Sequence, residues 1–339
     1  MIKTMVSFLC CTLLLSCAKP TDPESLTPTS GGYTIVARVP THGFAQDVEV
    51  VDTLVYIAQG EGGLAVMSVR DPARPKIIDT VFQQGVRGYA YKLACKDSIV
   101  FLASGGFGIN TINVSNPYVP LFVANYSGAS STNDVEVFGT WILEAKGEKG
   151  VRFGDLFQID PGYVNAKGSI ASPGYAHGMT ITADSSLIIA CGEMGVAIYD
   201  LRDIGRVEGY YDDSKRYTQW IDLPGYAVDV VTFANHPIAF LACGTAGIQV
   251  VDFADSGNIR VVGGYATGGY AKEIAYSNGR LYVTTELRGL QIFSVENPAS
   301  PRLVGVVDTE YALGLAVDQH YVYVADQDEG LIVIAIPPY

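Results

Sequence analysis

The chain repeats a short unit seven times, and this repetition constrains its fold more than any other feature. The unit is marked by the tripeptide Gly-Tyr-Ala, which occurs at residues 88–90, 174–176, 225–227 and 269–271. Variants of it at 43–45 and 310–312 mark two more units, and a seventh begins near Thr132. The seven units start at 45, 90, 132, 176, 227, 271 and 312. A period of this length indicates propeller blades or pairs of helices.

Within each unit the sequence is typical of short β-strands. In the first unit we expect strands at 47–51, 54–58, 64–69 and 76–81, because these runs are rich in Val, Ile and Tyr and are separated by turns with Gly or Pro. The turn between the second and third strands ends in Gly at positions 63, 108, 150, 195, 247, 289 and 330. A Gly that recurs there supplies a backbone conformation that other residues avoid. Four short strands per unit predict an all-β fold, a β-propeller of four-stranded blades.

The two ends of the chain supply the missing parts of one blade. The last unit stops after its third strand, 331–336, and an unassigned strand, 33–39, precedes the first unit. We expect the N-terminal strand to pair with the C-terminal blade and close the ring, which selects seven blades. The third unit lacks the opening Tyr and the Asn-Pro turn, so its outer strand is the least defined by sequence.

The units resemble LVIVD repeats, a family of propeller-forming repeats of bacteria and archaea that includes lipoproteins. The resemblance rests on the Tyr-Ala-x-Asp-Val start, on third strands such as Gly-Ile-Gln-Val-Val-Asp at 247–252, and on the Asn-Pro-x-x-Pro turn at 116–120. It covers residues 33–339 and implies a β-propeller.

The N-terminus has the layout of a bacterial export signal. Lys3 supplies the positive start, and the apolar run 5–15 is too short to span a bilayer. The run ends in Leu-Leu-Ser-Cys at 14–17, which resembles the lipobox of bacterial lipoproteins and implies a lipid on Cys17. An ordinary secretory signal, cut after a small residue, is the alternative.

Lipidation at Cys17 predicts where the protein resides. We expect residues 1–16 to be removed, 17–32 to form the lipidated Cys and a flexible tether rich in Pro, Ser and Thr, and 33–339 to form the propeller. The protein is then exported and lipid-anchored at the bacterial cell envelope, at the periplasmic or surface face of the outer membrane, with the lipid as its membrane contact. Its formal net charge of -13 disfavours nucleic acid and anionic lipid headgroups as partners.

Charged residues recur along the first strands, which line the channel of a propeller. Asp47, Asp134 and Asp229 share one register, and Lys92 and Glu273 take that place in two other blades. Recurrence in a repeat is usually structural, for example a side chain that caps a neighbouring turn. A functional role at the channel mouth is the alternative.

No catalytic or nucleotide-binding motif occurs in the chain, and we predict no catalytic residue, cofactor or metal. Of the four histidines, only His177 follows the Tyr-Ala motif and is expected near the channel mouth, so a three-His metal site is not predicted. The alternative is a lactonase- or esterase-like propeller hydrolase with a metal or acidic site there. Its first candidate residues are Asp47, Asp134, Asp229 and His177.

Two further groups of residues carry weaker expectations. Carboxylates in the turns between the second and third strands should gather on one face, at Glu61, Glu148, Glu193, Glu286, Asp326, Asp328 and Glu329. Solvated turn charges explain them better than a cation site, because the spacing of a calcium-binding loop is missing. Cys191 and Cys243 occupy the same position in successive units and are expected to be buried thiols.

The fourth unit is the longest because of an insertion at 203–219. Tyr210 and Tyr211 lie among charged residues in it, and Trp220 follows, a composition typical of a recognition surface. An irregular outer strand would look similar, and both interpretations stay open. We therefore expect a non-enzymatic envelope lipoprotein, a monomeric ring that acts as a binding platform for protein or glycan.

Overall fold

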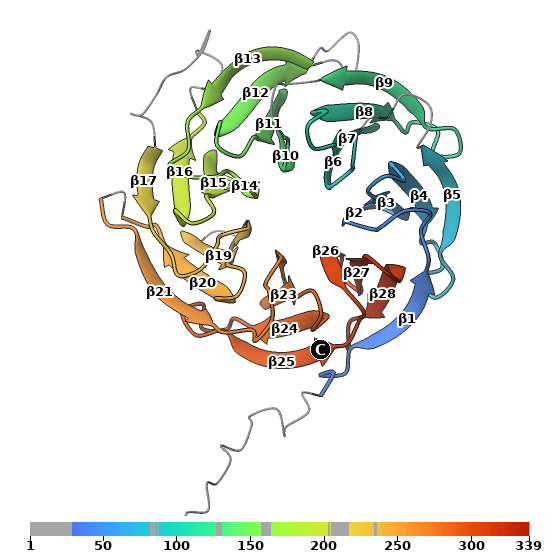
Figure 1. Cartoon of the computed structure of the whole chain (residues 1–339). Coiled ribbons are helices and arrows are strands. Elements are labelled where there is room, and N and C mark those ends of the chain that lie inside the picture. The colour runs from blue at the N-terminus through green and yellow to red at the C-terminus, as the bar shows by residue number, and fades with distance from the viewer. Residues whose placement is uncertain are drawn as a thin grey trace, which may run out of the picture.

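The computed structural model describes residues 29–81, 86, 88–126, 131–156, 164–202, 204, 217–233, 236–255 and 257–338. Within these ranges the chain forms seven four-stranded antiparallel sheets arranged as a ring around a central channel (Figure 1). The predicted seven-bladed β-propeller is therefore confirmed. In this described part of the chain, no helix is long and apolar enough to cross a membrane.

Each blade runs from an inner strand at the channel to an outer strand at the rim. Blade 1 holds β2 (Asp47–Val51), β3 (Leu54–Ala58), β4 (Leu64–Ser68) and β5 (Lys76–Val81). Blade 2 holds β6 (Lys92–Lys96), β7 (Ile99–Ala103), β8 (Ile109–Asn113) and β9 (Leu121–Tyr126). Blade 3 holds β10 (Asp134–Phe138), β11 (Trp141–Ala145), β12 (Val151–Leu156) and β13 (Val164–Ile170). The strands expected for the first unit match those of blade 1 to within one residue.

The other blades repeat this order. Blade 4 holds β14 (Met179–Ile181), β15 (Ser186–Ala190), β16 (Val196–Asp200) and β17 (Tyr217–Ile221). Blade 5 holds β18 (Asp229–Thr232), β19 (Ile238–Ala242), β20 (Ile248–Asp252) and β21 (Arg260–Tyr265). Blade 6 holds β22 (Glu273–Ser277), β23 (Arg280–Thr284), β24 (Leu290–Ser294) and β25 (Arg302–Val307). Blade 7 holds β26 (Ala312–Val317), β27 (Tyr321–Asp326), β28 (Gly330–Ala335) and β1 (Thr34–Val39).

The N-terminal strand closes the ring, as predicted. β1 pairs antiparallel with β28, from Thr34 opposite Ala335 to Val39 opposite Leu331, and forms the outer strand of blade 7 (Figure 1). Tyr33, next to β1, is buried, and its ring lies edge-on to Tyr282 of blade 6 with centroids 6.1 Å apart. The first strand of the chain therefore joins its last blade and contacts the one before it.

Apolar side chains fill the space between neighbouring blades. A separate buried cluster lies between each adjacent pair of blades. Cys191 and Cys243 are fully buried in two of these clusters and form no disulfide, in agreement with the prediction of buried thiols. The ring is held by these interfaces, because hydrogen-bond ladders connect strands within a blade.

The interface between blades 2 and 3 holds a buried charged group, which was not expected from the sequence. Glu144 is fully buried on β11, where the other blades place an apolar residue. Its carboxylate lies 3.3 Å from Lys146 Nζ and 2.6 Å from Arg152 Nε, and it accepts a hydrogen bond from Thr132. The apolar cluster at this interface is correspondingly small.

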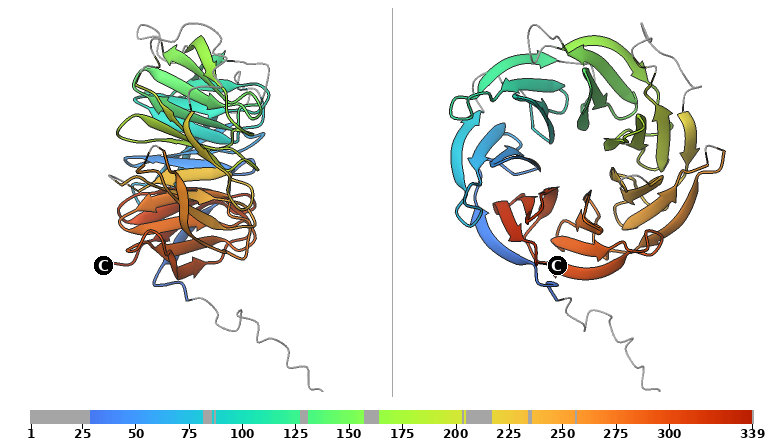
Figure 2. Two further views of the ribbon diagram at one scale, coloured as in Figure 1. Left: turned by 90° about the vertical axis from the view of Figure 1, so that its left-hand side faces the viewer. Right: turned by 180° about the vertical axis from the view of Figure 1, so that it is seen from behind.

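The Gly-Tyr-Ala motif and the turns between second and third strands lie on one face of the ring, which we call the mouth face. The motif Ala pairs with the first Gly of the turn in the preceding blade, three residues before the recurring turn Gly, as in Ala90 with Gly60 and Ala227 with Gly192. Because strands alternate in direction, the remaining turns lie on the opposite face. Figure 2 shows the ring from its edge and from behind.

The recurring turn Gly has the role predicted for it. Gly150 has a φ of +72°, and a Cβ there would lie 2.1 Å from the carbonyl oxygen of Ile170. Gly195, Gly247 and Gly330 show the same left-handed backbone and the same close approach of a carbonyl oxygen. Another residue at these positions would be strained and would also collide with the outer strand.

Candidate functional site

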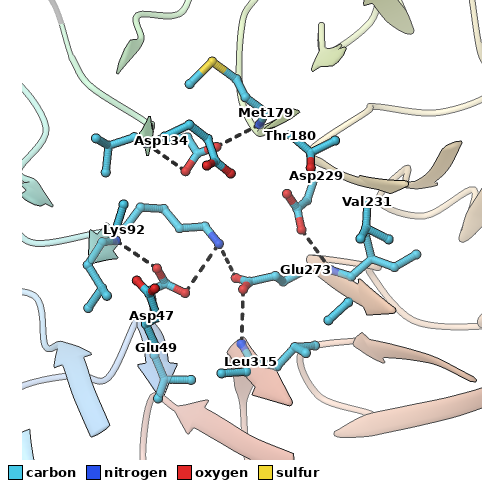
Figure 3. Close-up of a pocket in the computed structure, with 18 of the residues that line it drawn as sticks. Asp47, Glu49, Lys92, Asp134, Met179, Thr180, Asp229, Val231, Glu273 and Leu315 are labelled. Atoms are coloured by element: carbon cyan, nitrogen blue, oxygen red, sulfur yellow. Dashed lines mark hydrogen bonds and ion pairs between the residues drawn. The ribbon is translucent and has the colours of Figure 1, made fainter. Parts of the chain in front are cut away.

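The inner strands place one equivalent residue per blade around the channel. In blade order these residues are Asp47, Lys92, Asp134, Gly178, Asp229, Glu273 and Gly314. The acids have a structural role, since each accepts a hydrogen bond from a backbone nitrogen of the next blade (Figure 3). Asp47 Oδ2 lies 2.9 Å from the nitrogen of Leu93, and Asp229 Oδ2 lies 2.9 Å from the nitrogen of Ile274. The acidic residues that recur in the sequence thus connect neighbouring blades.

Lys92 spans the channel from blade 2 to blade 6. Its Nζ lies 2.5 Å from Glu273 Oε2 and 3.4 Å from Asp47 Oδ1 (Figure 3). Two residues of this bridge, Lys92 and Glu273, line both of two cavities in the channel. One, of about 400 Å³, extends along the inner strands past Glu49, and the other, of about 340 Å³, opens at the mouth face and is called the mouth pocket.

The channel holds more carboxylates than cations. Besides the acids named above, Glu49 and Glu136 line the larger cavity. Burial raises the pKa of Asp134 to about 7, against the lowering effect of the Lys92 charge. Burial also raises the pKa of Glu49 to about 7, against a hydrogen bond with Cys95. Burial alone would lower the pKa of Lys92, but the surrounding carboxylates hold it well above its ordinary value.

His177 lines the mouth pocket. Its Nε2 is 3.2 Å from the hydroxyl of Tyr226, and its ring centroid is 4.8 Å from that of Tyr175. Burial, together with the charge of Lys272, lowers the pKa of His177 to about 4. The imidazole is therefore neutral at pH 7, and Asp134 and Asp229 line the same pocket.

The motif aromatics surround the channel on the mouth face, and we call them the aromatic collar. The collar consists of Phe44, Tyr89, Tyr175, Tyr226, Tyr270 and Tyr311. Tyrosines of the collar lie over the first Gly of the turn in the preceding blade. A Cβ on Gly60 would lie 2.6 Å from the ring of Tyr89, and a Cβ on Gly147 would lie 2.7 Å from the ring of Tyr175. The motif Tyr therefore packs directly on this Gly, and a side chain at the Gly would collide with the Tyr ring.

Exposed aromatic side chains are concentrated on the mouth face. Of the five that the described residues hold, Phe44, Tyr91, Phe107 and Trp220 are on this side, and Tyr118 is on the opposite face. Trp220 is 39% exposed on β17, the outer strand of blade 4, and its Nε1 donates a hydrogen bond to the carbonyl of Met194 in a mouth-face turn. Tyr210 and Tyr211 lie outside the described residues.

The turn carboxylates lie on the mouth face, but they do not form one group. Asp326 is fully buried and accepts hydrogen bonds from the backbone nitrogens of Tyr311, Asp328 and Glu329, so it caps its turn. Glu329 forms an ion pair with Arg38. Among the residues that the structure describes, no group of three or more His, Cys, Asp or Glu is placed to hold a metal ion.

Comparison with known proteins agrees with the repeat and the fold. The LVIVD repeat family matches residues 42–82, 268–309 and 311–336, which lie in blades 1, 6 and 7. The chain therefore contains LVIVD repeats, and its fold is a seven-bladed β-propeller. No curated protein matches it.

Solved structures similar to this LVIVD-repeat propeller share its fold at low sequence identity. The WD40 β-propeller domain of Doa1 is 12% identical with a TM-score of 0.68, over 90% of this chain and 98% of that one. U3-55K is 7% identical with a TM-score of 0.70, over 91% and 100% of the two chains. The computationally designed Ika8 protein is 8% identical with a TM-score of 0.62, over 89% and 100%. At these identities the likeness concerns the fold alone.

Proposed function

We propose that this LVIVD-repeat propeller is a non-enzymatic lipoprotein of the bacterial envelope, a monomeric ring that binds a protein or glycan partner on its mouth face. The observation that carries the proposal is the concentration of exposed aromatic side chains there, namely Phe44 of the collar together with Tyr91, Phe107 and Trp220. Aromatic side chains are enriched in recognition surfaces, because they give a large rigid contact area at low entropic cost.

The channel acids support a binding role better than a hydrolytic one. Asp47, Asp134 and Asp229 each accept a backbone hydrogen bond from another blade. A carboxylate held in this way is part of the ring structure, and its replacement disturbs a blade interface before it disturbs any chemistry. These residues therefore serve the scaffold that presents the mouth face.

The point where the described chain begins is compatible with an N-terminal anchor. The carbonyl of Thr29 accepts a hydrogen bond from the nitrogen of Val306 on β25, at the outer edge of blade 6. Cys17 is 12 residues earlier, a length that spans at most about 40 Å when extended. An anchor attached at the rim leaves both faces of the ring accessible to partners.

Replacing Cys17 by Ser tests the anchor. We expect the variant to remain unprocessed or to move to the aqueous fraction, because the acylated sulfur is lost. Detergent partitioning and the mass of the mature protein measure this. A normal mature mass with unchanged partitioning would show that Cys17 carries no lipid.

Replacing Phe44 and Phe107 together by Ala tests the binding surface. Both side chains are at least half exposed, so we expect a stability change below about 0.5 kcal/mol. Capture of partners from envelope extracts should fall strongly, whereas Tyr118→Ala on the opposite face should capture the wild-type set. Equal capture by both variants would move the search to the insertion, where Tyr210→Ala with Tyr211→Ala is the next test.

A further inference from the structure

The mouth pocket is lined in large part by residues from one position of the repeat, at the start of each inner strand, where every blade carries a different residue. In blade order this position holds Gln46, Tyr91, Asn133, His177, Val228, Lys272 and Leu313. The residue before it is Ala in six blades and Thr in the third, and the residue after it is an acid in four. Residues that recur in a repeat build the common scaffold. A position that differs in every blade is not needed for the common scaffold. Six of the seven residues at this position line one pocket.

We propose that the mouth pocket binds the ring of a neutral sugar, such as the end of a glycan chain. The inference rests on the proposed binding function and names the ligand class for part of the same face. The cavity of about 340 Å³ lies near the lower end of the range of ligand pockets, which is about 300 to 1,000 Å³. A single ring is therefore a better match than a larger ligand.

The charges around the pocket favour a ligand without net charge. Its charged lining residues have both signs and are Asp134, Asp229, Glu273, Lys92 and Lys272. The ammonium of Lys92 is engaged by Glu273 and Asp47. An anionic ligand would meet the two aspartates, and a cationic one would meet Lys272. Hydroxyl groups satisfy both signs, because they donate to carboxylates and accept from an ammonium, and such charge-assisted hydrogen bonds are the strong ones.

Aromatic and amide side chains complete the match to a sugar ring. Tyr91 is 44% exposed and is supported by Tyr89, with ring centroids 4.7 Å apart. An aromatic face of this kind packs against the C–H face of a pyranose. Asn133 donates its Nδ2 to the carbonyl of Ala176, which holds the amide at the pocket, and Gln46 adds a second amide. Polar groups placed among aromatic walls fix the orientation of a ligand.

Ligand-observed saturation-transfer NMR on the full chain tests the proposal. The probes are glucose, galactose, mannose and N-acetylglucosamine, with glucuronate, glucosamine and glycine as the anionic, cationic and zwitterionic comparisons. We expect at least one neutral sugar to bind. We expect binding at least about tenfold weaker in Tyr91→Ala and in Lys272→Met, and unchanged binding in Tyr118→Ala. Circular dichroism melting of each variant verifies the fold. Two pocket variants are used so that the test still holds if one of them does not fold.

Three results would overturn the proposal. These are no binding by any neutral probe, tighter binding of a charged or zwitterionic probe, or equal binding by wild type and both pocket variants. The outcome is separable from that of the proposed function. If the Phe44 and Phe107 variant loses protein partners and no sugar binds the wild type, the proposed binding function is supported and the sugar site is excluded. Unchanged capture with no sugar bound would remove the sugar site and would also exclude Phe44 and Phe107 as the partner-binding surface.

Discussion

Replacing Lys92 by Met should destabilise the ring strongly at about pH 8 and much less at about pH 5. Lys92 is the cation that joins Glu273 to Asp47 across the channel. Removing one partner of a buried ion pair leaves uncompensated charge, which costs about 3 to 5 kcal/mol. Denaturant unfolding at the two pH values measures the loss.

The pH dependence follows from the channel carboxylates. Folding raises the pKa of Asp134 from 3.8 to about 7, chiefly through burial. A group with a raised folded-state pKa stabilises the fold fully below its ordinary pKa, and this contribution is lost as the pH rises through the folded-state value. The Lys92 charge opposes the raised pKa of Asp134 and Asp229. Without it, ionisation between about pH 5 and pH 8 should cost more stability than in the wild type.

Lys76→Met is the matched control for this prediction. Lys76 is exposed at the start of β5, so the same substitution there removes one positive charge outside the channel. We expect a change within about 0.5 kcal/mol at both pH values. A loss in Lys92→Met that is the same at both pH values, or no larger than in the control, would show that the channel bridge does not hold the carboxylates.

Removing residues 1–39 should open the ring. The truncated chain loses β1 and the buried Tyr33, and loss of a core aromatic alone costs about 3 to 5 kcal/mol. β28, which is buried over all but its last residue, would become an unpaired apolar edge and promote aggregation. We therefore expect a lower melting temperature and larger particles on size-exclusion chromatography.

A chain that starts at Gly31 is the control, because it keeps Tyr33 and all of β1. It should melt as the longer protein does and remain monomeric. Equal melting temperatures for the two truncated chains would contradict closure by the N-terminal strand as a source of stability.

The architecture could be predicted from the sequence because its determinants are local and repeated. Residues 47–51 alternate between polar and apolar side chains, and residues 54–58 form a short apolar run, as exposed and buried strands do. The turn Gly at 63 needs a left-handed backbone whatever surrounds it. Seven copies of these signals leave few arrangements other than a ring of blades. Closure followed from counting strands at the two ends.

The candidate site was predicted only in part, because its contacts join distant units. The sequence placed Asp47, Asp134, Asp229 and His177 at the channel, but their partners depend on where the blades lie. Lys92 and Glu273 are 181 residues apart and meet only because the ring brings blades 2 and 6 to one axis. The sequence shows that the position before each acid differs in every unit. Only the structure shows that these residues line one pocket.

The sequence by itself determined the repeat, the strands, the turns and the number of blades, since each depends on residues close together in the chain. Tertiary structure alone decided the Lys92 bridge, the position of Tyr91 and Lys272 on one pocket, and the polar interface around Glu144. The physical reason is that electrostatic contacts and pKa values depend on burial and on distances across the ring. Local sequence patterns carry neither quantity.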